Sequence, residues 1–298
     1  MIPYFQQPSV DIGPLTIHAF GAIVALAVFV GLLIGERRFA ALGLDRELGG
    51  RMAWWIIVAG FLGAHLFAVL FYFPRLVVDD PLVLLRFWDH ISSFGGILGG
   101  AVGLWLFFRL KAREIGPVTR LAYLDVAAFV FPMSLMIGRI GCALAHDHPG
   151  AVTSFPIAIS LESAPAQDYI RAVYTDVGRG AELPPAAALS QLGFHDLGLY
   201  EALYLGLLVV PAMLLLARRS RPHGYFLGAF VLLYMPARFL LDILRVSDVR
   251  YVGLTPAQWV AASALAVLLV VRLRARLRTT WLWFALAGAA LACAGPSL

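Results

Sequence analysis

The sequence has few charged residues and few cysteines. Of its 298 residues, 14% are Asp, Glu, Lys or Arg, 61% are hydrophobic, and the mean hydropathy is +0.83. These values exclude an ordinary soluble domain. The two cysteines, Cys142 and Cys293, both lie beside apolar sequence and form neither a disulfide framework nor a zinc motif.

Several common motifs are also missing. The sequence contains no HExxH, no GxSxG, no P-loop and no dinucleotide-binding fingerprint. No internal repeat of fixed period is visible, which argues against a secondary transporter built from repeats. The function must therefore be inferred from other residues.

Long apolar segments dominate the chain instead. A helix needs about 20 mostly apolar residues to cross a bilayer. The sequence predicts an all-α polytopic membrane protein with a single domain over residues 1–298 and seven transmembrane helices, at 16–35, 52–73, 91–109, 122–145, 198–217, 224–244 and 256–273. The extra C-terminal segment, 279–298, contains an eighth apolar stretch that spans the membrane, lies in its interface or packs as a tail.

Basic residues cluster in alternate loops. Of the 23 Lys and Arg residues, 15 follow the first, third, fifth and seventh predicted spans. This asymmetry predicts that the N-terminus lies outside the cytoplasm. The net charge of +5 does not indicate nucleic acid, because the bases form short clusters between apolar segments, a pattern typical of contact with anionic lipid. The one long connection, about 147–197, falls on the outer side and is expected to be functional or disordered.

An arginine stands near the end of one predicted span. Arg139 follows the apolar stretch 126–135 and precedes Cys142, His146, Asp147 and His148. An arginine at the centre of a bilayer costs roughly 2.5–3.5 kcal/mol on insertion scales, so it normally faces a polar cavity. The stretch from residue 136 to 150 therefore indicates action on a charged molecule in the bilayer.

A second charged group lies in the sixth predicted span. Arg238, Asp242 and Arg245 share one helical face because their spacings are four and three residues. They form an ion-pair network between helices, or a cavity wall that binds phosphate. Two arginines around one carboxylate leave a positive charge, and with Arg139 they favour a shared anionic ligand such as a phospholipid head group.

Glycines and two further titratable residues complete the candidate set. Gly95 and Gly96 open a glycine-rich run that either packs closely against another helix or lets a ligand approach the backbone. His195 and Glu201 precede or begin the fifth span. Glu201 is expected to pair with a base, to cap the helix or to belong to the site.

Five segments together resemble one family. The segment 12–21 (IGPLTIHAFG) resembles the pattern IGP…HWYG, and 71–100 resembles FY…P…WDGGMSFHGG. Residues 138–150 resemble GRxGNFxNGExxG, 195–201 resembles RHPSQLYE, and 237–245 resembles FRxxxEFxR. In order and spacing they resemble the motifs of prolipoprotein diacylglyceryl transferases, which are bacterial inner-membrane enzymes.

The resemblance implies transfer of the diacylglyceryl group from phosphatidylglycerol to the lipobox cysteine thiol of a prolipoprotein signal peptide, with release of glycerol phosphate and no cofactor or metal. On the matched positions we expect catalytic roles for Arg139, Arg238 and Asp242, and on position alone for Asp147 and His90. The resemblance implies substrate-binding roles for Arg139, Arg245, Gly95, Gly96, Gly150, Glu201, His195 and Cys142.

The chain departs from the family patterns at several positions. Phe94 and Phe20 replace a histidine and a tyrosine, and Cys142 and Asp147 replace an asparagine and a glutamate. Because a thiol must lose a proton to become a nucleophile, another residue has to act as base. By position, the candidates are His90, His65, His146 and Asp147. Two other hypotheses remain: a non-catalytic or altered-specificity relative that binds anionic phospholipid or lipoprotein, and a transporter of an anionic amphiphile.

Overall fold

The computed structural model is mostly helical. It describes the chain except for residues 14, 88–89, 112–114, 247–249 and 294–298, and except for the side chains of residues 12, 15, 17, 72, 93–94 and 275–293. The principal helices are α1 (Ala19–Ala41), α2 (Arg46–Phe67), α4 (Ser93–Leu110), α5 (Pro117–Ala145), α8 (Leu197–Tyr204), α9 (Val210–Leu216), α10 (Tyr225–Leu241) and α11 (Pro256–Cys293).

Short elements extend or join these helices. The π-helix η1 (Ala68–Tyr72) continues α2, the π-helix η4 (Leu205–Val209) joins α8 to α9, and the 3₁₀-helix η5 (Asp242–Leu244) follows α10. The others are α3 (Pro74–Asp79), η2 (Pro81–Leu85), α6 (Ala164–Asp176), η3 (Gly180–Glu182) and α7 (Ala186–Leu189).

Six helical segments in the described part of the chain are long and apolar enough to cross a membrane. They are Ala19–Ala41, Arg46–Phe71, Pro117–Ala145, Leu197–Leu216, Tyr225–Leu244 and Pro256–Arg274. They match six of the seven predicted spans, with boundaries that differ by at most six residues. The remaining predicted span, the third at 91–109, corresponds to α4, whose 18 residues include a shorter apolar stretch, Gly95–Leu110. Large apolar side chains such as Phe71, Trp105 and Leu207 stay exposed on these helices, as contact with lipid would require.

Helices α2 and α4 pack unusually closely, and glycines make this possible. A Cβ atom added to Gly63 of α2 would lie 2.7 Å from the carbonyl oxygen of Gly95 and 2.7 Å from the Cα atom of Gly99, both on α4. Gly60 and Gly96 face each other in the same contact, because a Cβ atom on Gly60 would lie 3.3 Å from the carbonyl oxygen of Gly96. The glycine-rich run therefore does pack closely against a neighbouring helix.

The predicted all-α class is incomplete, because the described residues include five short strands outside the long helices. The strands β1 (Ser9–Ile12) and β2 (Leu15–His18) form a hairpin before α1. In the three-stranded antiparallel sheet, β5 (Gly193–Asp196) lies between β3 (Pro149–Thr153) and β4 (Ile159–Ser160). These strands have two to five residues, too few for an alternating pattern to stand out in the sequence.

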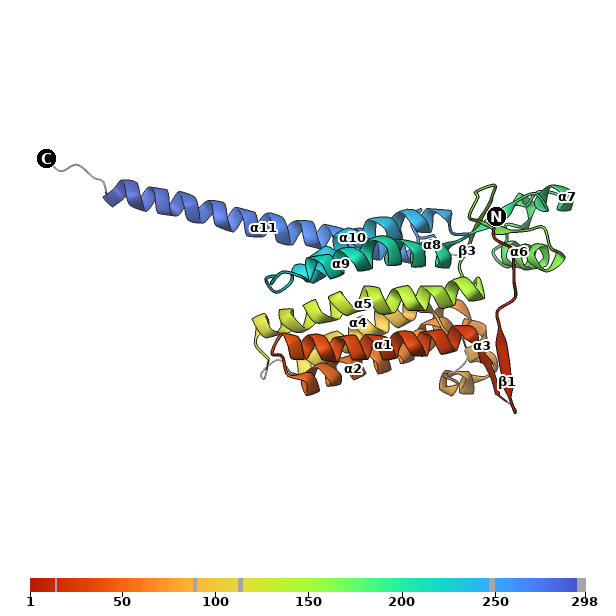
Figure 1. The fold of residues 1–298 in the computed structure, drawn as a ribbon, viewed down its shortest axis with the longest axis horizontal. Coiled ribbons are helices and arrows are strands. Elements are labelled where there is room, and N and C mark those ends of the chain that lie inside the picture. The colour runs from red at the N-terminus through yellow and green to blue at the C-terminus, as the bar shows by residue number, and fades with distance from the viewer. Residues whose placement is uncertain (14, 88–89, 112–114, 247–249, 294–298) are drawn as a thin grey trace.

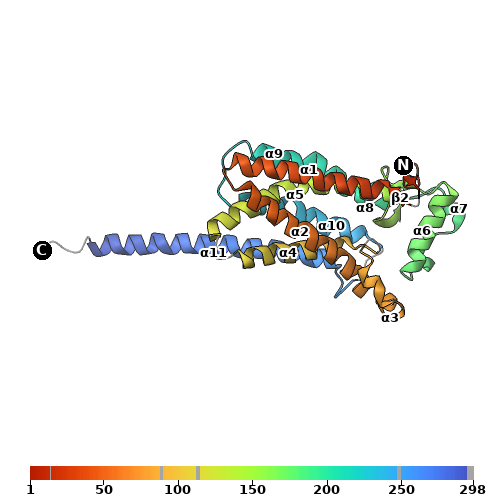
Figure 2. The same ribbon diagram turned by 90° about the horizontal axis from the view of Figure 1, so that it is seen from below.

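The long connection 147–197 is folded. Its sheet and α6 enclose a separate apolar core that includes Leu161, Ile170 and Phe194. Figure 1 shows β3, α6 and α7 at one end of the helices, and the α1–α2 and α9–α10 turns at the other. Figure 2 shows α6 and α7 at that same end in the second view. The connection therefore forms a small cap at one end of the bundle.

Helix α11 is longer than the predicted seventh span. It continues without a break from Pro256 to Cys293, so the eighth apolar stretch belongs to the same helix. Figures 1 and 2 show its C-terminal half extending beyond the other helices. Its start is fixed by Thr255, whose hydroxyl accepts a hydrogen bond from the amide of Gln258 at 3.2 Å, while the Gln258 side chain accepts one from the Thr255 amide at 3.0 Å.

Candidate functional site

A buried ion pair joins the last turns of α5 to the first turns of α8. The Nε atom of Arg139 lies 3.0 Å from the Oε2 atom of Glu201. Arg139 is 4% exposed and Glu201 is 1% exposed, so water screens neither charge. Both residues belong to the predicted set, and the structure brings them together although 62 positions separate them in the chain.

The charged face of α10 continues this network. Arg238 lies with its Nη1 atom 3.7 Å from the Oε2 atom of Glu201 and with its Nη2 atom 3.1 Å from the Oδ1 atom of Asp242. Arg245 approaches the same Asp242 oxygen at 3.9 Å. The three residues therefore share one face, as their spacing predicts, and Glu201 connects that face to Arg139.

Hydroxyl groups hold the two carboxylates in place. The hydroxyl of Tyr234 donates a hydrogen bond to Glu201, and the hydroxyl of Thr255 donates one to Asp242. Tyr234, Arg238 and Asp242 are spaced four residues apart, so one face of α10 and η5 carries all three. These contacts lower the cost of burying the carboxylates, because a buried charge needs hydrogen bonds as well as a counter-charge.

The arginines keep unused hydrogen-bonding capacity. Among the described residues, the buried Nε atom of Arg139 and the buried Nη1 atom of Arg238 have no hydrogen-bond partner, although each lies within ion-pair distance of Glu201. Buried donors without acceptors are rare in folded proteins and need an explanation. An anion bound between the arginines would supply the missing acceptors.

The loop after α5 places a histidine beside Arg139 and a carboxylate beside that histidine. The Nη1 atom of Arg139 lies 2.9 Å from the Nε2 atom of His148 and 3.5 Å from the sulfur of Cys142. The Nδ1 atom of His148 lies 2.5 Å from the Oδ1 atom of Asp147. Burial lowers the pKa of His148; the hydrogen bond with Asp147 opposes this shift, and the charges of Arg139 and Arg245 add to it.

Cys142, Asp147 and His148 bring one potential metal-ligand atom each within 4.8 Å of one another. The guanidinium of Arg139 already contacts Cys142 and His148. A metal cation there would face a fixed positive charge without screening by water. We therefore interpret this group as part of an anion site with an acid–base pair.

Gly150 lets the end of α10 approach the loop. It forms an isolated bridge with Arg245, and a Cβ atom on it would lie 2.9 Å from the carbonyl oxygen of Leu244 and 2.8 Å from the Cβ atom of His195. A side chain at this position would push Arg245 away from the loop. His195 is half-buried, its Nδ1 atom lies 3.0 Å from the hydroxyl of Tyr200, and burial lowers its pKa.

Three of the predicted base candidates make contacts away from the arginine network. The Nε2 atom of His65 donates to the carbonyl oxygen of Val83 at 3.0 Å. His146 caps α5 in a left-handed conformation, and its Nδ1 atom lies 2.7 Å from Asp196, which in turn caps α8. His90 is exposed and packs its ring against Phe73, so it lies outside the buried network. The expected base at these three positions is therefore not supported by the geometry.

The predicted substrate-binding residues fall into two places. Arg245 and Glu201 belong to the arginine network, Cys142 contacts Arg139, and Gly150 lies between Arg245 and His195. Gly95 and Gly96 lie in the contact between α2 and α4, where they serve close packing. The side chain of Phe94 lies outside the described residues, so its replacement of the family histidine has no structural description.

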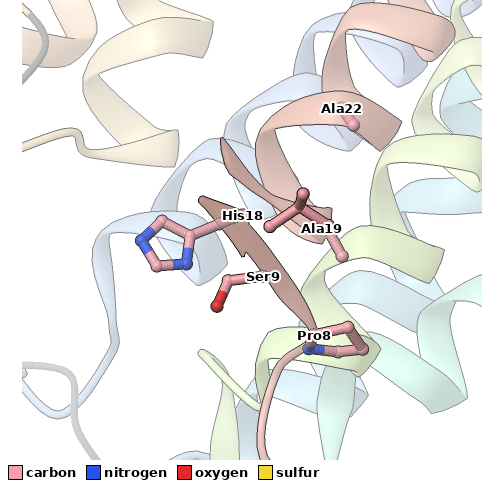
Figure 3. Close-up of a pocket in the computed structure, with 6 residues that line it drawn as sticks. Pro8, Ser9, His18, Ala19 and Ala22 are labelled. Atoms are coloured by element: carbon pink, nitrogen blue, oxygen red, sulfur yellow. The ribbon is translucent and has the colours of Figure 1, made fainter. Parts of the chain in front are cut away.

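Two cavities lie away from this network. One, of about 200 Å³, lies beside the β1–β2 hairpin and the start of α1, and Figure 3 shows Pro8, Ser9, His18, Ala19 and Ala22 along it. The other, also about 200 Å³, is lined by residues at the opposite end of the helices, among them Arg38, Asp125 and Arg221. Neither of these two cavities is lined by Arg139 or Glu201.

Sequence reasoning missed Tyr234, Thr255 and His148 as partners of the charged residues. Tyr234 was detectable in principle, because it precedes Arg238 by one helical turn on the same face. His148 stands at a position that the pattern GRxGNFxNGExxG leaves open. Thr255 gives no local signal, because it reaches Asp242 across a turn of the chain.

Comparison with known proteins agrees with the motifs. The family model described as "Prolipoprotein diacylglyceryl transferase" matches residues 7–274. Two similar relatives carry the name phosphatidylglycerol–prolipoprotein diacylglyceryl transferase. The one from Chromohalobacter salexigens is 29% identical over 267 residues, covering 88% of this chain and 87% of the relative. The one from Thermus thermophilus is 32% identical over 243 residues, covering 78% of this chain and 81% of the relative.

Proposed function

Because the chain belongs to the prolipoprotein diacylglyceryl transferase family, we propose that it transfers the diacylglyceryl group of phosphatidylglycerol to a prolipoprotein. The acceptor is the thiol of the lipobox cysteine in the signal peptide, and glycerol phosphate is released. Both substrates are specified by the names of the relatives, phosphatidylglycerol–prolipoprotein diacylglyceryl transferases.

The buried arginine network carries this proposal. Arg139, Arg238 and Arg245 contribute three guanidinium groups, and Glu201 and Asp242 contribute two carboxylates. One positive charge remains in excess within the buried network, while the partly exposed Asp147 pairs with His148 at its edge. The planar guanidinium fork suits phosphate oxygens, so the phosphate of the lipid head group is the expected ligand.

The reaction makes use of this charge. When the thiolate sulfur attacks the glyceryl carbon, the C–O bond to the phosphate breaks and negative charge grows on the leaving phosphate. Arginines fixed in a site without water stabilise that charge more strongly than water would, and they need no reorganisation. Arg139 and Arg238 bind and neutralise the phosphate, Glu201 and Asp242 hold the arginines in position, and Gly150 keeps Arg245 beside the loop.

Location and topology follow from the same proposal. The protein lies in the bacterial inner membrane as a single domain with seven spans, of which α4 is the shortest, and with its N-terminus outside the cytoplasm. The cap formed by residues 147–197 then covers the outer end, where signal peptides emerge. The concentration of basic residues at the opposite turns supports this orientation.

The test is a transfer assay with purified protein in phosphatidylglycerol vesicles and a synthetic lipobox peptide. The proposal predicts glycerol phosphate in solution and a peptide heavier by one diacylglyceryl group. A serine peptide and vesicles of phosphatidylcholine alone should give neither product. If folded protein binds phosphatidylglycerol but forms no product, the non-catalytic binding hypothesis replaces this one.

A further inference from the structure

We propose that His148 is the general base of the transfer, and that binding of the lipid phosphate to Arg139 releases it for this task. This inference rests on the proposed function and assigns the proton transfer within it. It gives a chemical role to a residue that the family pattern leaves unspecified. It also supplies the base that the sequence lacks at Phe94.

The neighbours of His148 fix its tautomer. A carboxylate can only accept a hydrogen bond, so the proton of the neutral imidazole lies on Nδ1, 2.5 Å from the Oδ1 atom of Asp147. The guanidinium of Arg139 can only donate, so the Nε2 atom, 2.9 Å away, must present its lone pair. His148 is thus neutral, with a basic nitrogen directed at the arginine that we expect to bind phosphate.

His148 is also the histidine best placed for the task. It is 5% exposed, and of the described histidines it is the one whose ring contacts Arg139. His65, His146 and His195 use a ring nitrogen on Val83, Asp196 and Tyr200, respectively. Histidines held in this way can support structure, but their described contacts do not direct them at the anion site.

Phosphate binding would change the surroundings of His148. In the structure, the Nη1 atom of Arg139 uses the lone pair of His148 as an acceptor. A bound phosphate offers stronger, charged acceptors to the same guanidinium, so the Nε2 lone pair becomes available to a thiol. The Nε2 atom of His148 can therefore act as a base only after the phospholipid has bound.

The charges around His148 also make it a stronger base once phosphate is bound. The groups facing His148 are Asp147 on its own loop, Arg139 and Cys142 on α5, Glu201 on α8 and Arg245 after η5. Arg139 and Arg245 lower the pKa of His148, and a phosphate between them would offset both charges. The imidazole then becomes a stronger base at the moment when the leaving group is in place.

The proposed step accounts for every proton and electron pair that moves. The thiol proton moves to the Nε2 atom of His148, the sulfur forms a bond to the glyceryl carbon, and the carbon–oxygen bond to phosphate breaks. The electron pair of that bond leaves with the phosphate oxygen, whose charge Arg139 stabilises. The imidazolium then passes its proton to the departing glycerol phosphate or to water, which restores the neutral base.

The experiment compares a cysteine peptide with the same peptide carrying selenocysteine, with wild-type protein and with His148→Gln in phosphatidylglycerol vesicles. A selenol is already ionised at neutral pH and needs no base. With the cysteine peptide, His148→Gln should lower kcat by about 10²- to 10⁴-fold, the usual contribution of general base catalysis. With the selenocysteine peptide, most of this deficit should disappear. The control substitution His223→Gln, at an exposed residue, should give the same kcat as wild type with both peptides.

The possible outcomes distinguish a failure of His148 as the base from a failure of the proposed transferase activity. If wild-type protein releases no glycerol phosphate with either peptide, the proposed function fails. If wild type is active and His148→Gln is equally active, or if its deficit is the same with both peptides, His148 is not the base but the transferase assignment stands. Phosphatidylglycerol binding and Tm, measured on each variant, exclude a loss of folding as the cause.

Asp147→Asn provides an independent check that does not need His148 to be changed. Asp147 acts through His148 as a positioning residue, and its hydrogen bond raises the pKa of the imidazole. Its replacement should reduce kcat and move the acidic limb of the pH profile to lower pH. A reduced kcat with an unmoved limb would contradict the proposal.

Discussion

Arg139 and Glu201 form an ion pair of 3.0 Å that joins α5 to α8 inside the protein. Glu201 also lies 3.7 Å from Arg238, so a single carboxylate connects three helices. The arrangement orients two guanidinium groups toward a common point while it leaves hydrogen-bond donors on both unused. This pair is therefore both a structural connection and the centre of the proposed phosphate site.

Glu201→Gln should destabilise the protein. The amide can still accept the hydrogen bond of Tyr234, but it leaves the buried Arg139 and Arg238 without their shared counter-charge. Breaking a buried pair in this way costs on the order of 3–5 kcal/mol, so Tm measured in detergent should fall clearly. The matched control, Glu182→Gln, removes an exposed partner of Arg179 and should leave Tm unchanged. Equal Tm values for the two variants would show that the buried pair adds no stability.

The pH dependence of the transfer should reveal the state of His148. Burial and two arginines lower its pKa in the unliganded protein, so the acidic limb of kcat/KM should lie below the ordinary pKa of about 6.5. Bound phosphate offsets the arginine charges, so the limb of kcat, which reports the lipid complex, should lie at higher pH. Initial rates over a series of pH values and phosphatidylglycerol fractions measure both limbs. Coinciding limbs, or a kcat limb at lower pH, would contradict this order.

Gly63→Ala should weaken the contact between α2 and α4. The new Cβ atom would lie 2.7 Å from the carbonyl oxygen of Gly95 and 2.7 Å from the Cα atom of Gly99, so the two backbones must separate. Overpacking of this kind typically costs about 1–3 kcal/mol, which a lower Tm would show. Gly50→Ala, in the same helix, has no atom within 4 Å of the new Cβ and should leave Tm unchanged or slightly raised. A Tm for Gly63→Ala as high as that for Gly50→Ala would mean that the helices do not need this close approach.

The helices are the part of the fold that the sequence predicts best. Six spans match because apolar length is a local property, and the shared face of Arg238, Asp242 and Arg245 follows from spacing within one helix. Glu201 was a candidate, but its meeting with Arg139 depends on how α5 and α8 pack, which no local pattern contains. The same reason explains Thr255, which reaches Asp242 across the turn before α11.

The strands and the base were harder to predict for different reasons. The strands of the cap are too short to show periodicity, and they form because Gly193 and Phe194 pair with residues on both sides. Among titratable residues, position in a motif favours His146 and Asp147 over His148. Only the geometry shows that His146 is held by Asp196, whereas His148 lies between Asp147 and Arg139.

The most direct measurement is the release of glycerol phosphate per diacylglyceryl-modified peptide, by wild type and by Arg139→Ala, in phosphatidylglycerol vesicles. Wild type should form the two products in equal amounts. Arg139→Ala should reduce both by about 10²- to 10³-fold or more, because the leaving phosphate loses a fixed counter-charge. Arg179→Ala, which alters an exposed pair, should match wild type. Unchanged turnover in folded Arg139→Ala would contradict the central role of the arginine network.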